Sequence, residues 1–232
     1  LKYALAKVSV KALITAESFK TSNYLEMLGD LIPELSTCKP GRLSAAQFPL
    51  LTSIIQTGAV NQPGMFRFQE IMEMGAGAYL ARLDGISQKL FSDESINLQF
   101  TSGTTGAPKG VMLKHDSFSS YILANVMPAD PDEEKKNILT VPLHHIAGMQ
   151  AVISAIYGGR TLVIQRQFEP RDWMRLVQEE QINRAMMVPT MLKAILDHKE
   201  FQDFDISSLG VITYGAAPMM SLIPILRCRR RR

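Results

Sequence analysis

The stretch TSGTTGAPKG, from Thr101 to Gly110, is the most informative part of the sequence. It combines four hydroxyl residues, three glycines and one lysine. The segment Ile96–Phe100 before it alternates with period two, as a strand does, and Gly110–Leu113 after it reads as a second strand. Glycines let backbone N–H groups approach a phosphate, hydroxyls add donors, and a lysine balances phosphate charge. The stretch therefore predicts a hairpin whose long loop wraps a triphosphate.

This loop differs from a Walker A loop, which needs G-x-x-x-x-G-K-[ST] ahead of a helix. Here Lys109 is followed by Gly110, so no hydroxyl comes next to hold Mg²⁺. An alternative interpretation is a polar hairpin turn without a ligand. Hairpin turns usually have two to five residues, so the length of this loop favours ligand binding.

Composition places the chain among globular proteins. Of its 232 residues, 46% are hydrophobic and 20% are charged, which allows one or two domains and argues against disorder. No apolar run reaches the ~18 residues of a membrane span. Cys38 and Cys228 lie far apart and predict two free thiols rather than a disulfide framework or a zinc site.

The net charge of +3 comes from the end of the chain. Five arginines fall within residues 227–232, and without them 20 basic residues face 22 acidic ones. A basic run can bind nucleic acid or anionic lipid. A solvated tail or an artefact of the sequence is the interpretation we favour, and we expect no nucleic-acid partner.

Strands and helices alternate along the second half of the chain. The predicted strands are 138–141, 161–165, 185–188 and 210–214, and the predicted helices are 147–157, 170–180 and 191–198. The first half predicts a helix at 1–7, a strand at 10–15, an apolar stretch at 51–55 and helices at 22–28, 68–74, 79–83 and from an Asp116 or Ser117 cap to about 126. This alternation predicts an α/β fold with a mainly parallel sheet and helices on both faces.

Two loops follow predicted strands at their carboxyl ends, where ligands bind in such sheets. The first contains His144 and His145, a pair that fits either a hydrogen-bonded cap or a ligand site and lacks a third ligand for zinc. The second is Tyr214-Gly215-Ala216-Ala217-Pro218. Its small residues allow close approach of a ligand, and they would equally serve a tight turn from strand to helix.

The loop sequence resembles the phosphate-loop signature of the adenylate-forming (AMP-dependent synthetase/ligase) superfamily, which includes acyl-CoA synthetases, 4-coumarate ligases, luciferases and peptide-synthetase adenylation domains. The match holds at every informative position from Thr101 to Gly110, and the resemblance extends from Leu1 to about Leu226. The segments Val10–Ile14 and Lys39-Pro40-Gly41 are most similar to the subfamily of acyl-CoA synthetase family member 2.

The resemblance implies that residues 1–226 are part of the N-terminal, AMP-binding domain of the superfamily fold. Its first α/β part would be 1–95, the phosphate-loop hairpin 96–115 and its second α/β part 116–226. A basic tail would occupy 227–232, and the C-terminal domain is expected to be absent.

The resemblance also implies an acid–thiol ligase that uses ATP, Mg²⁺ and coenzyme A. A carboxylic acid, expected to be a fatty acid, would attack the α-phosphate of ATP, and coenzyme A would then displace AMP from the acyl-adenylate. The residues implied to bind the nucleotide are Thr101, Ser102, Gly103, Thr104, Thr105, Gly106, Ala107, Pro108 and Lys109. Those implied to act in catalysis are Lys109, Thr104 and His145, and those implied to bind substrate are His145, Gly215, Ala216, Ala217 and Pro218. His144 stands where the superfamily usually has an aromatic residue.

Several superfamily parts are not found in the sequence. No Tyr-Gly-x-Thr-Glu motif follows Pro218, and we assign no metal ligand. We therefore expect a fragment of an acyl-CoA ligase that is inactive by itself. The alternative is a truncated, non-catalytic nucleotide-binding protein with an arginine-rich, anion-binding tail. The resemblance suggests a mitochondrial or cytoplasmic location, which the residues themselves leave open.

Overall fold

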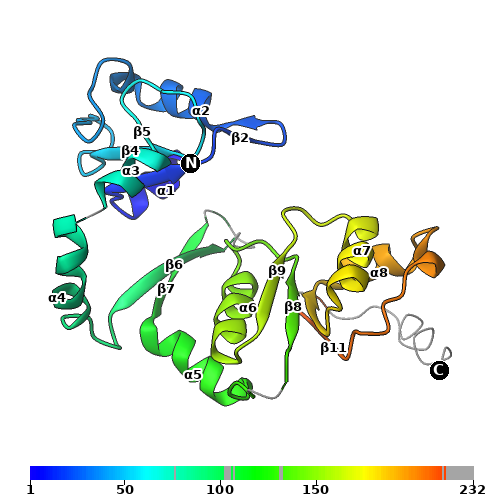
Figure 1. Ribbon diagram of the computed structural model, residues 1–232. Coiled ribbons are helices and arrows are strands. Elements are labelled where there is room, and N and C mark those ends of the chain that lie inside the picture. The colour runs from blue at the N-terminus through cyan, green and yellow to red at the C-terminus, as the bar shows by residue number, and fades with distance from the viewer. Residues whose placement is uncertain (76, 102–105, 107, 131–132, 216, 218–232) are drawn as a thin grey trace. The chain divides into compact units, whose positions relative to one another are not determined.

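The computed structural model describes residues 1–75, 77–101, 106, 108–130, 133–215 and 217 (Figure 1). The chain divides into two units, residues 1–89 and 90–232. The domain boundary predicted at residue 95 stays a prediction.

The first unit is built on a short parallel sheet in the order β1-β4-β5. Its strands are β1 (Ala12–Thr15), β4 (Ser53–Gln56) and β5 (Phe66–Arg67), and its first helices are α1 (Lys2–Lys7) and α2 (Tyr24–Leu31). Asn23 caps α2, because its side chain accepts a hydrogen bond from the Glu26 N–H. Leu28 and Ile32 pack with Leu51 and Ile54 in a fully buried cluster. The predicted strand and first two helices are therefore present, with shifted ends.

The remaining elements of the first unit are short. They are a hairpin of β2 (Ser18–Phe19) and β3 (Ser22–Asn23), α3 (Phe68–Met74), α4 (Leu83–Ser87) and 3-10 helices at Pro33–Ser36 and Gly77–Arg82. Residues 79–83 are helical as predicted, in a 3-10 helix that is followed directly by α4, but the predicted helix end at Asp84-Gly85 was wrong. A 3-10 helix ends at Arg82 and α4 continues through Gly85, where a Cβ would meet no atom within 4 Å.

The second unit begins with an antiparallel hairpin of β6 (Ser95–Thr101) and β7 (Lys109–Lys114). Thr101 pairs with Lys109 at its open end, so the two predicted strands are confirmed. Helix α5 (His115–Asn125) follows β7 directly. Its N-cap is Lys114, two residues before Asp116 and three before Ser117, the two predicted caps. Ser117 instead lies in the first turn and accepts a hydrogen bond from the Lys114 N–H at 3.1 Å.

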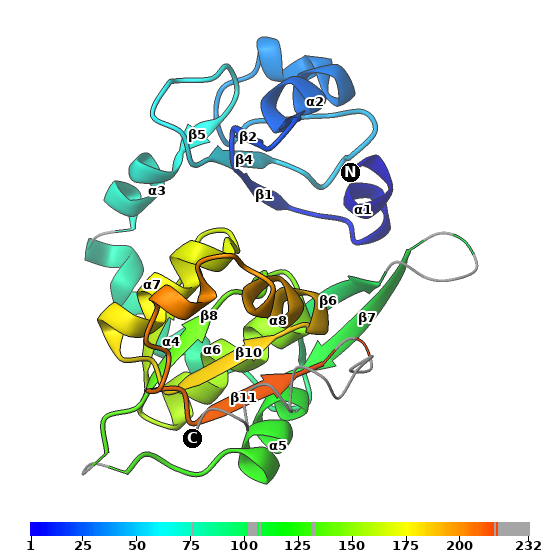
Figure 2. The same ribbon diagram turned by 90° about the vertical axis from the view of Figure 1, so that its right-hand side faces the viewer.

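A four-stranded parallel sheet in the order β11-β10-β8-β9 forms the rest of the second unit. The strands are β8 (Lys136–Leu139), β9 (Thr161–Ile164), β10 (Arg184–Met187) and β11 (Val211–Tyr214). The helices are α6 (Ile146–Tyr157), α7 (Pro170–Glu180) and α8 (Pro189–Leu196), with a 3-10 turn at Phe201–Asp203. Helices α7 and α8 lie on one face of the sheet, and α5 and α6 lie on the other (Figures 1 and 2). The predicted parallel α/β fold is confirmed.

The register of the sheet assigns its two faces. Ala185, Ile138 and Val163 are aligned across β10, β8 and β9 and belong to the cluster beneath α7 and α8. That cluster includes Trp173, which is 1% exposed. One residue earlier, Arg184, Asn137 and Leu162 form the next row. Because side chains alternate along a strand, this second row faces α5 and α6.

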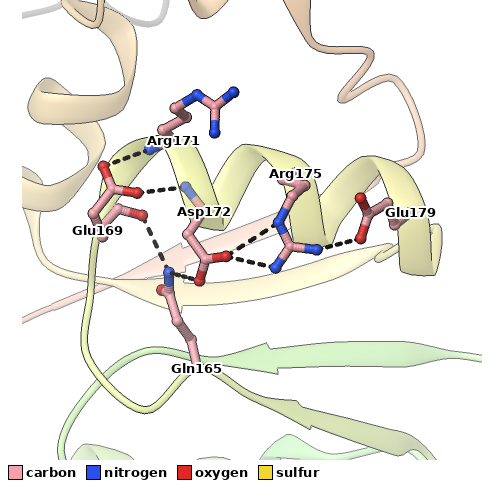
Figure 3. Close-up of polar contacts among 6 residues, drawn as sticks. All are labelled: Gln165, Glu169, Arg171, Asp172, Arg175 and Glu179. Carbon is pink, nitrogen blue, oxygen red and sulfur yellow. Dashed lines mark hydrogen bonds and ion pairs between the residues drawn. The ribbon is translucent and has the colours of Figure 1, made fainter.

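Helix α7 is fixed by a network of polar contacts at its first turn (Figure 3). Glu169 caps the helix by accepting hydrogen bonds from the backbone N–H groups of Arg171 at 3.0 Å and Asp172 at 2.6 Å. Asp172 accepts hydrogen bonds from Arg175 and from buried Gln165, which lower the pKa of its carboxyl below the usual range. Pro170 at the first helical position needs no hydrogen-bond acceptor. These contacts hold the helix end against the end of β9.

Candidate functional site

The open end of the β6–β7 hairpin carries the residues predicted to bind phosphate. Thr101 and Lys109 face each other across it, and the Thr101 hydroxyl donates to the Lys109 carbonyl at 3.4 Å. Both side chains are exposed to solvent. Gly106 has φ +148°, a conformation that L side chains rarely adopt, which explains a glycine at this point of the loop. Ser102, Gly103, Thr104, Thr105 and Ala107 lie outside the described residues.

Gly110 packs closely against the facing strand of the hairpin. A Cβ at this position would lie 2.7 Å from the Leu98 Cδ2 atom on the facing strand. The last glycine of the loop sequence therefore has a packing function and need not contact a ligand.

The hairpin contacts α6 through its polar side chains. The amide nitrogens of Asn97 and Gln99 lie 3.1 and 3.4 Å from the Met149 sulfur, in the first turns of α6. Ile96 and Leu98, on the other face of β6, are exposed. The polar residues of this strand thus face α6, the reverse of the usual pattern, so the alternation in the sequence alone would have placed Ile96 and Leu98 inward. Sequence reasoning did not assign Asn97, Gln99 or Met149 to the site.

The histidine loop joins β8 to α6 as a tight turn. The His145 N–H donates to the Pro142 carbonyl at 3.0 Å, and the Gly148 N–H donates to the His145 carbonyl at 2.9 Å. A Cβ at position 148 would lie 2.4 Å from the Pro142 oxygen. The spacing Pro142…His145…Gly148 is therefore a steric requirement, because only glycine lets the first turn of α6 close over Pro142.

The two histidine side chains are both exposed at the start of α6. Their ring centroids are 5.1 Å apart and the rings are tilted by 37°. His145 is the N-cap residue of α6, but its side chain makes no capping hydrogen bond. A structural capping role for the imidazole, one of the two interpretations of the pair, therefore finds no support in the geometry.

The loop after β11 leaves the sheet at the same edge. Met187 of β10 is aligned with Tyr214 of β11, and β10 lies between β11 and β8. A Cβ on Gly215 would meet no atom of the described residues within 4 Å, so none of them fills the space beside this glycine. Ala217 is exposed, and Ala216 and Pro218 lie outside the described residues.

Together these loops form one side of the second unit. The carboxyl ends of β8 and β11 carry the histidine loop and Gly215, and the hairpin with Lys109 is tied to the first turns of α6 through Met149. Among the described residues, no three His, Cys, Asp or Glu side chains are grouped so that they could hold a metal ion. None of the described helices is long and apolar enough to cross a membrane.

Comparison with known proteins gives concordant results. The sequence model of the family described as AMP-binding enzyme matches residues 1–224. The mitochondrial medium-chain acyl-CoA ligase ACSF2 of Danio rerio is 32% identical over 221 residues, which are 93% of this chain and 36% of that protein. The Homo sapiens ligase of the same name is 33% identical over 227 residues, 94% of this chain and 37% of that protein. A putative acyl-CoA synthetase, YngI of Bacillus subtilis, is 30% identical over 224 residues, 95% of this chain and 40% of that protein.

Solved structures share the fold at lower identity. The N-terminal domain of FACL13 from Mycobacterium tuberculosis has a TM-score of 0.70 at 20% identity, covering 99% of this chain and 50% of that one. The anthranilate CoA ligase AuaEII, in complex with anthranoyl-AMP, has a TM-score of 0.71 at 18% identity, covering 94% and 38%. The chain spans 36 to 40% of the length of the curated relatives named above.

Proposed function

Because the chain belongs to the AMP-binding enzyme family, we propose that it is part of an ATP-dependent acyl-CoA ligase. The family match over residues 1–224 is the observation that carries this proposal. The substrate we propose is a fatty acid, and the site of action is the mitochondrion, since several of its relatives carry the name medium-chain acyl-CoA ligase, mitochondrial. The alternative of a non-catalytic binding protein has no support in the comparisons, and its arginine-rich tail lies outside the described residues.

The proposed reaction has two steps. A carboxylate oxygen of the acid attacks the α-phosphorus of ATP, and the bond to the departing pyrophosphate breaks. The thiol sulfur of coenzyme A then attacks the acyl carbon, AMP leaves with the bonding electrons, and the thiol proton passes to solvent. Negative charge grows on the pyrophosphate in the first step, so fixed positive charge and hydrogen-bond donors lower its barrier.

We assign that positive charge to Lys109. Its side chain lies at the start of β7, opposite Thr101, where the backbone is held by strand pairing. A group on a rigid strand is positioned more accurately than one on a free loop. The residues Ser102 to Thr105, including Thr104, complete the phosphate loop in this proposal.

In this proposal, His145 lies beside the carboxylate of the substrate acid, and Gly215 lies beside the adenylate. His145 stands at the N-terminus of a 12-residue helix, where the helix dipole favours negative charge. At the same edge of the sheet, no described residue fills the space beside Gly215. The described residues offer no carboxylate cluster that fits Mg²⁺, so we assign no step to the metal here.

The test places Lys109→Ala in an enzyme completed with the remaining part of the human ligase. We expect the maximal rate of ATP–pyrophosphate exchange to fall about 10²- to 10³-fold, the effect of removing one stabilising group from a transition state. The KM for the acid should change little, because the lysine acts on the leaving pyrophosphate. Lys114→Ala, at the other end of β7, is the matched control and should be near wild type. An unchanged maximal rate with only a raised KM for ATP would contradict the assigned role.

A further inference from the structure

Two arginines lie near each other at the edge of the four-stranded sheet where its strands begin. The proposed nucleotide site lies at the other edge, where the strands end. Arg160 immediately precedes β9, and Arg184 is the first residue of β10. Arg184 is aligned with Asn137 of β8 and Leu162 of β9. Strand alternation puts Asn137 and Arg184 on the face toward α6. Arg160 comes directly before β9, and its side chain lies over Gly158 at the end of that helix.

Neither arginine has a carboxylate partner among the described residues. Other half-exposed arginines of this unit form ion pairs, Arg171 with Glu200 and Arg175 with Asp172. For Arg160, by contrast, burial and then the positive charge of Arg184 lower the pKa of the guanidinium. Two partly buried like charges that repel each other are costly unless an anion lies between them.

Capping of α6 does not explain Arg160. The last carbonyls of the helix already accept backbone hydrogen bonds, Ser154 from Gly158 at 3.0 Å and Ala155 from Arg160 at 2.8 Å. The Arg160 side chain instead packs over Gly158, where a Cβ would lie 2.8 Å from the Nε atom. This Nε is buried and has no acceptor among the described residues. A buried donor without a partner costs free energy that a bound acceptor would recover.

Asn137, on the strand between the two arginines, needs a hydrogen-bond donor rather than an acceptor. Its Oδ1 atom is buried and has no donor among the described residues. Among the described residues, the Arg160 Nε atom therefore lacks an acceptor and the Asn137 Oδ1 atom lacks a donor. Arg184 carries a second positive charge beside them. A phosphate that carries one proton supplies both, because its charged oxygens accept hydrogen bonds and its P–OH group donates one.

We propose that Arg160, Arg184 and Asn137 form a binding site for a singly protonated phosphate group, separate from the nucleotide loop. The guanidinium groups bind its charged oxygens and Asn137 Oδ1 accepts its hydroxyl proton. The group can be inorganic phosphate or the terminal group of a phosphate monoester. This site does not depend on the proposed ligase activity.

The test is thermal unfolding of the full 232-residue chain, followed by the fluorescence of Trp173, the single tryptophan. Sodium phosphate at pH 6.5 replaces chloride at constant ionic strength. We expect the midpoint to rise by about 3 °C or more near saturation. Arg160→Gln and Arg184→Gln should remove the rise, while Arg166→Gln, an exposed arginine after β9, and Lys109→Ala, in the nucleotide loop, should keep it.

A further variant keeps the test decisive if the glutamine variants fold poorly. Asn137→Asp places a fixed negative charge between the arginines, so it should raise the midpoint without phosphate and remove the response to phosphate. Equal unfolding midpoints in phosphate and chloride would overturn the proposed site. So would a rise in phosphate that is lost only in Lys109→Ala, because the phosphate would then bind at the nucleotide loop.

The same unfolding measurement in sulfate and in glycerol 3-phosphate identifies which anion the site binds. Sulfate has no hydroxyl proton at this pH, so an equal response to sulfate would overturn the recognition of a protonated phosphate. Glycerol 3-phosphate distinguishes the source. A larger rise than with inorganic phosphate assigns the site to monoesters, and a smaller rise assigns it to the free ion; either result supports the phosphate site.

Discussion

At the scale of single residues, the glycine of the histidine loop is constrained by sterics. We expect Gly148→Ala to lower the free energy of unfolding by about 1–3 kcal/mol, because its methyl group would lie 2.4 Å from the Pro142 carbonyl oxygen. Urea denaturation followed by Trp173 fluorescence measures this loss, since Trp173 is buried in the same unit.

The control for this prediction is Gly29→Ala in α2. A Cβ at Gly29 would meet no atom within 4 Å, so alanine should be neutral or stabilise by up to about 1 kcal/mol. If Gly148→Ala proves as harmless as this control, the turn that positions His145 is more adaptable than its contacts indicate.

The residues of the candidate site were predictable to different degrees. The order of glycines, hydroxyls and Lys109 marks a phosphate loop because few backbone conformations bind phosphate. The second purpose of Gly110 was not predictable, since its close neighbour Leu98 is brought near only by strand pairing. The contact of Asn97 and Gln99 with Met149 joins residues about 50 positions apart, and no local pattern indicates it.

At the scale of elements, the acid sensitivity of α7 should depend on Asp172. Its contacts lower the pKa of the carboxyl in the folded state, with the Arg175 hydrogen bond as the largest cause and Gln165 next. The stabilisation is therefore complete above the unfolded pKa of about 3.9 and is lost as the pH falls through the lowered folded pKa. Because the side chain is partly exposed, the effect should not exceed about 1 kcal/mol.

Urea midpoints of wild type and Asp172→Asn, recorded between pH 7 and pH 3, check this expectation. The variant should be less stable at pH 7, and the difference should shrink toward pH 3. Glu180→Gln, on the exposed end of the same helix, serves as the control and should show a much smaller difference at every pH. A wild-type advantage that stays constant down to pH 3 would assign the effect to packing rather than charge.

Most elements of the second unit were predictable because their strands are apolar and their helices begin and end with clear signals. Helix α7 lies where Pro170 and the sequence pattern placed it, whereas α8 begins at Pro189, two residues before the predicted start, since proline fits the first helical position. The β2–β3 hairpin was missed because its turn contains Lys20 at φ 54° instead of the Asn-Gly pair that usually marks such turns.

At the scale of the whole molecule, each unit has its own hydrophobic cluster. We expect Ile182→Ala to destabilise the second unit by about 2–5 kcal/mol, because Ile182 is fully buried against α7. The matched variant Ile54→Ala removes the same side chain from the first unit's cluster. It should lower the midpoint seen by far-ultraviolet circular dichroism while leaving the Trp173 transition near wild type. Equal shifts of the Trp173 transition in both variants would show that the units unfold together.

The alternating faces of the central sheet also determine which changes of chain length this protein can accept. Inserting one residue within β8 would exchange the row of Ile138 with the row of Asn137 and turn a polar amide into the cluster around Trp173. The same insertion at positions 128–130, in the exposed segment before the strand, would leave both rows in place. Length variation among homologues should therefore accumulate between the strands, and engineered tags or loop grafts should be tolerated there.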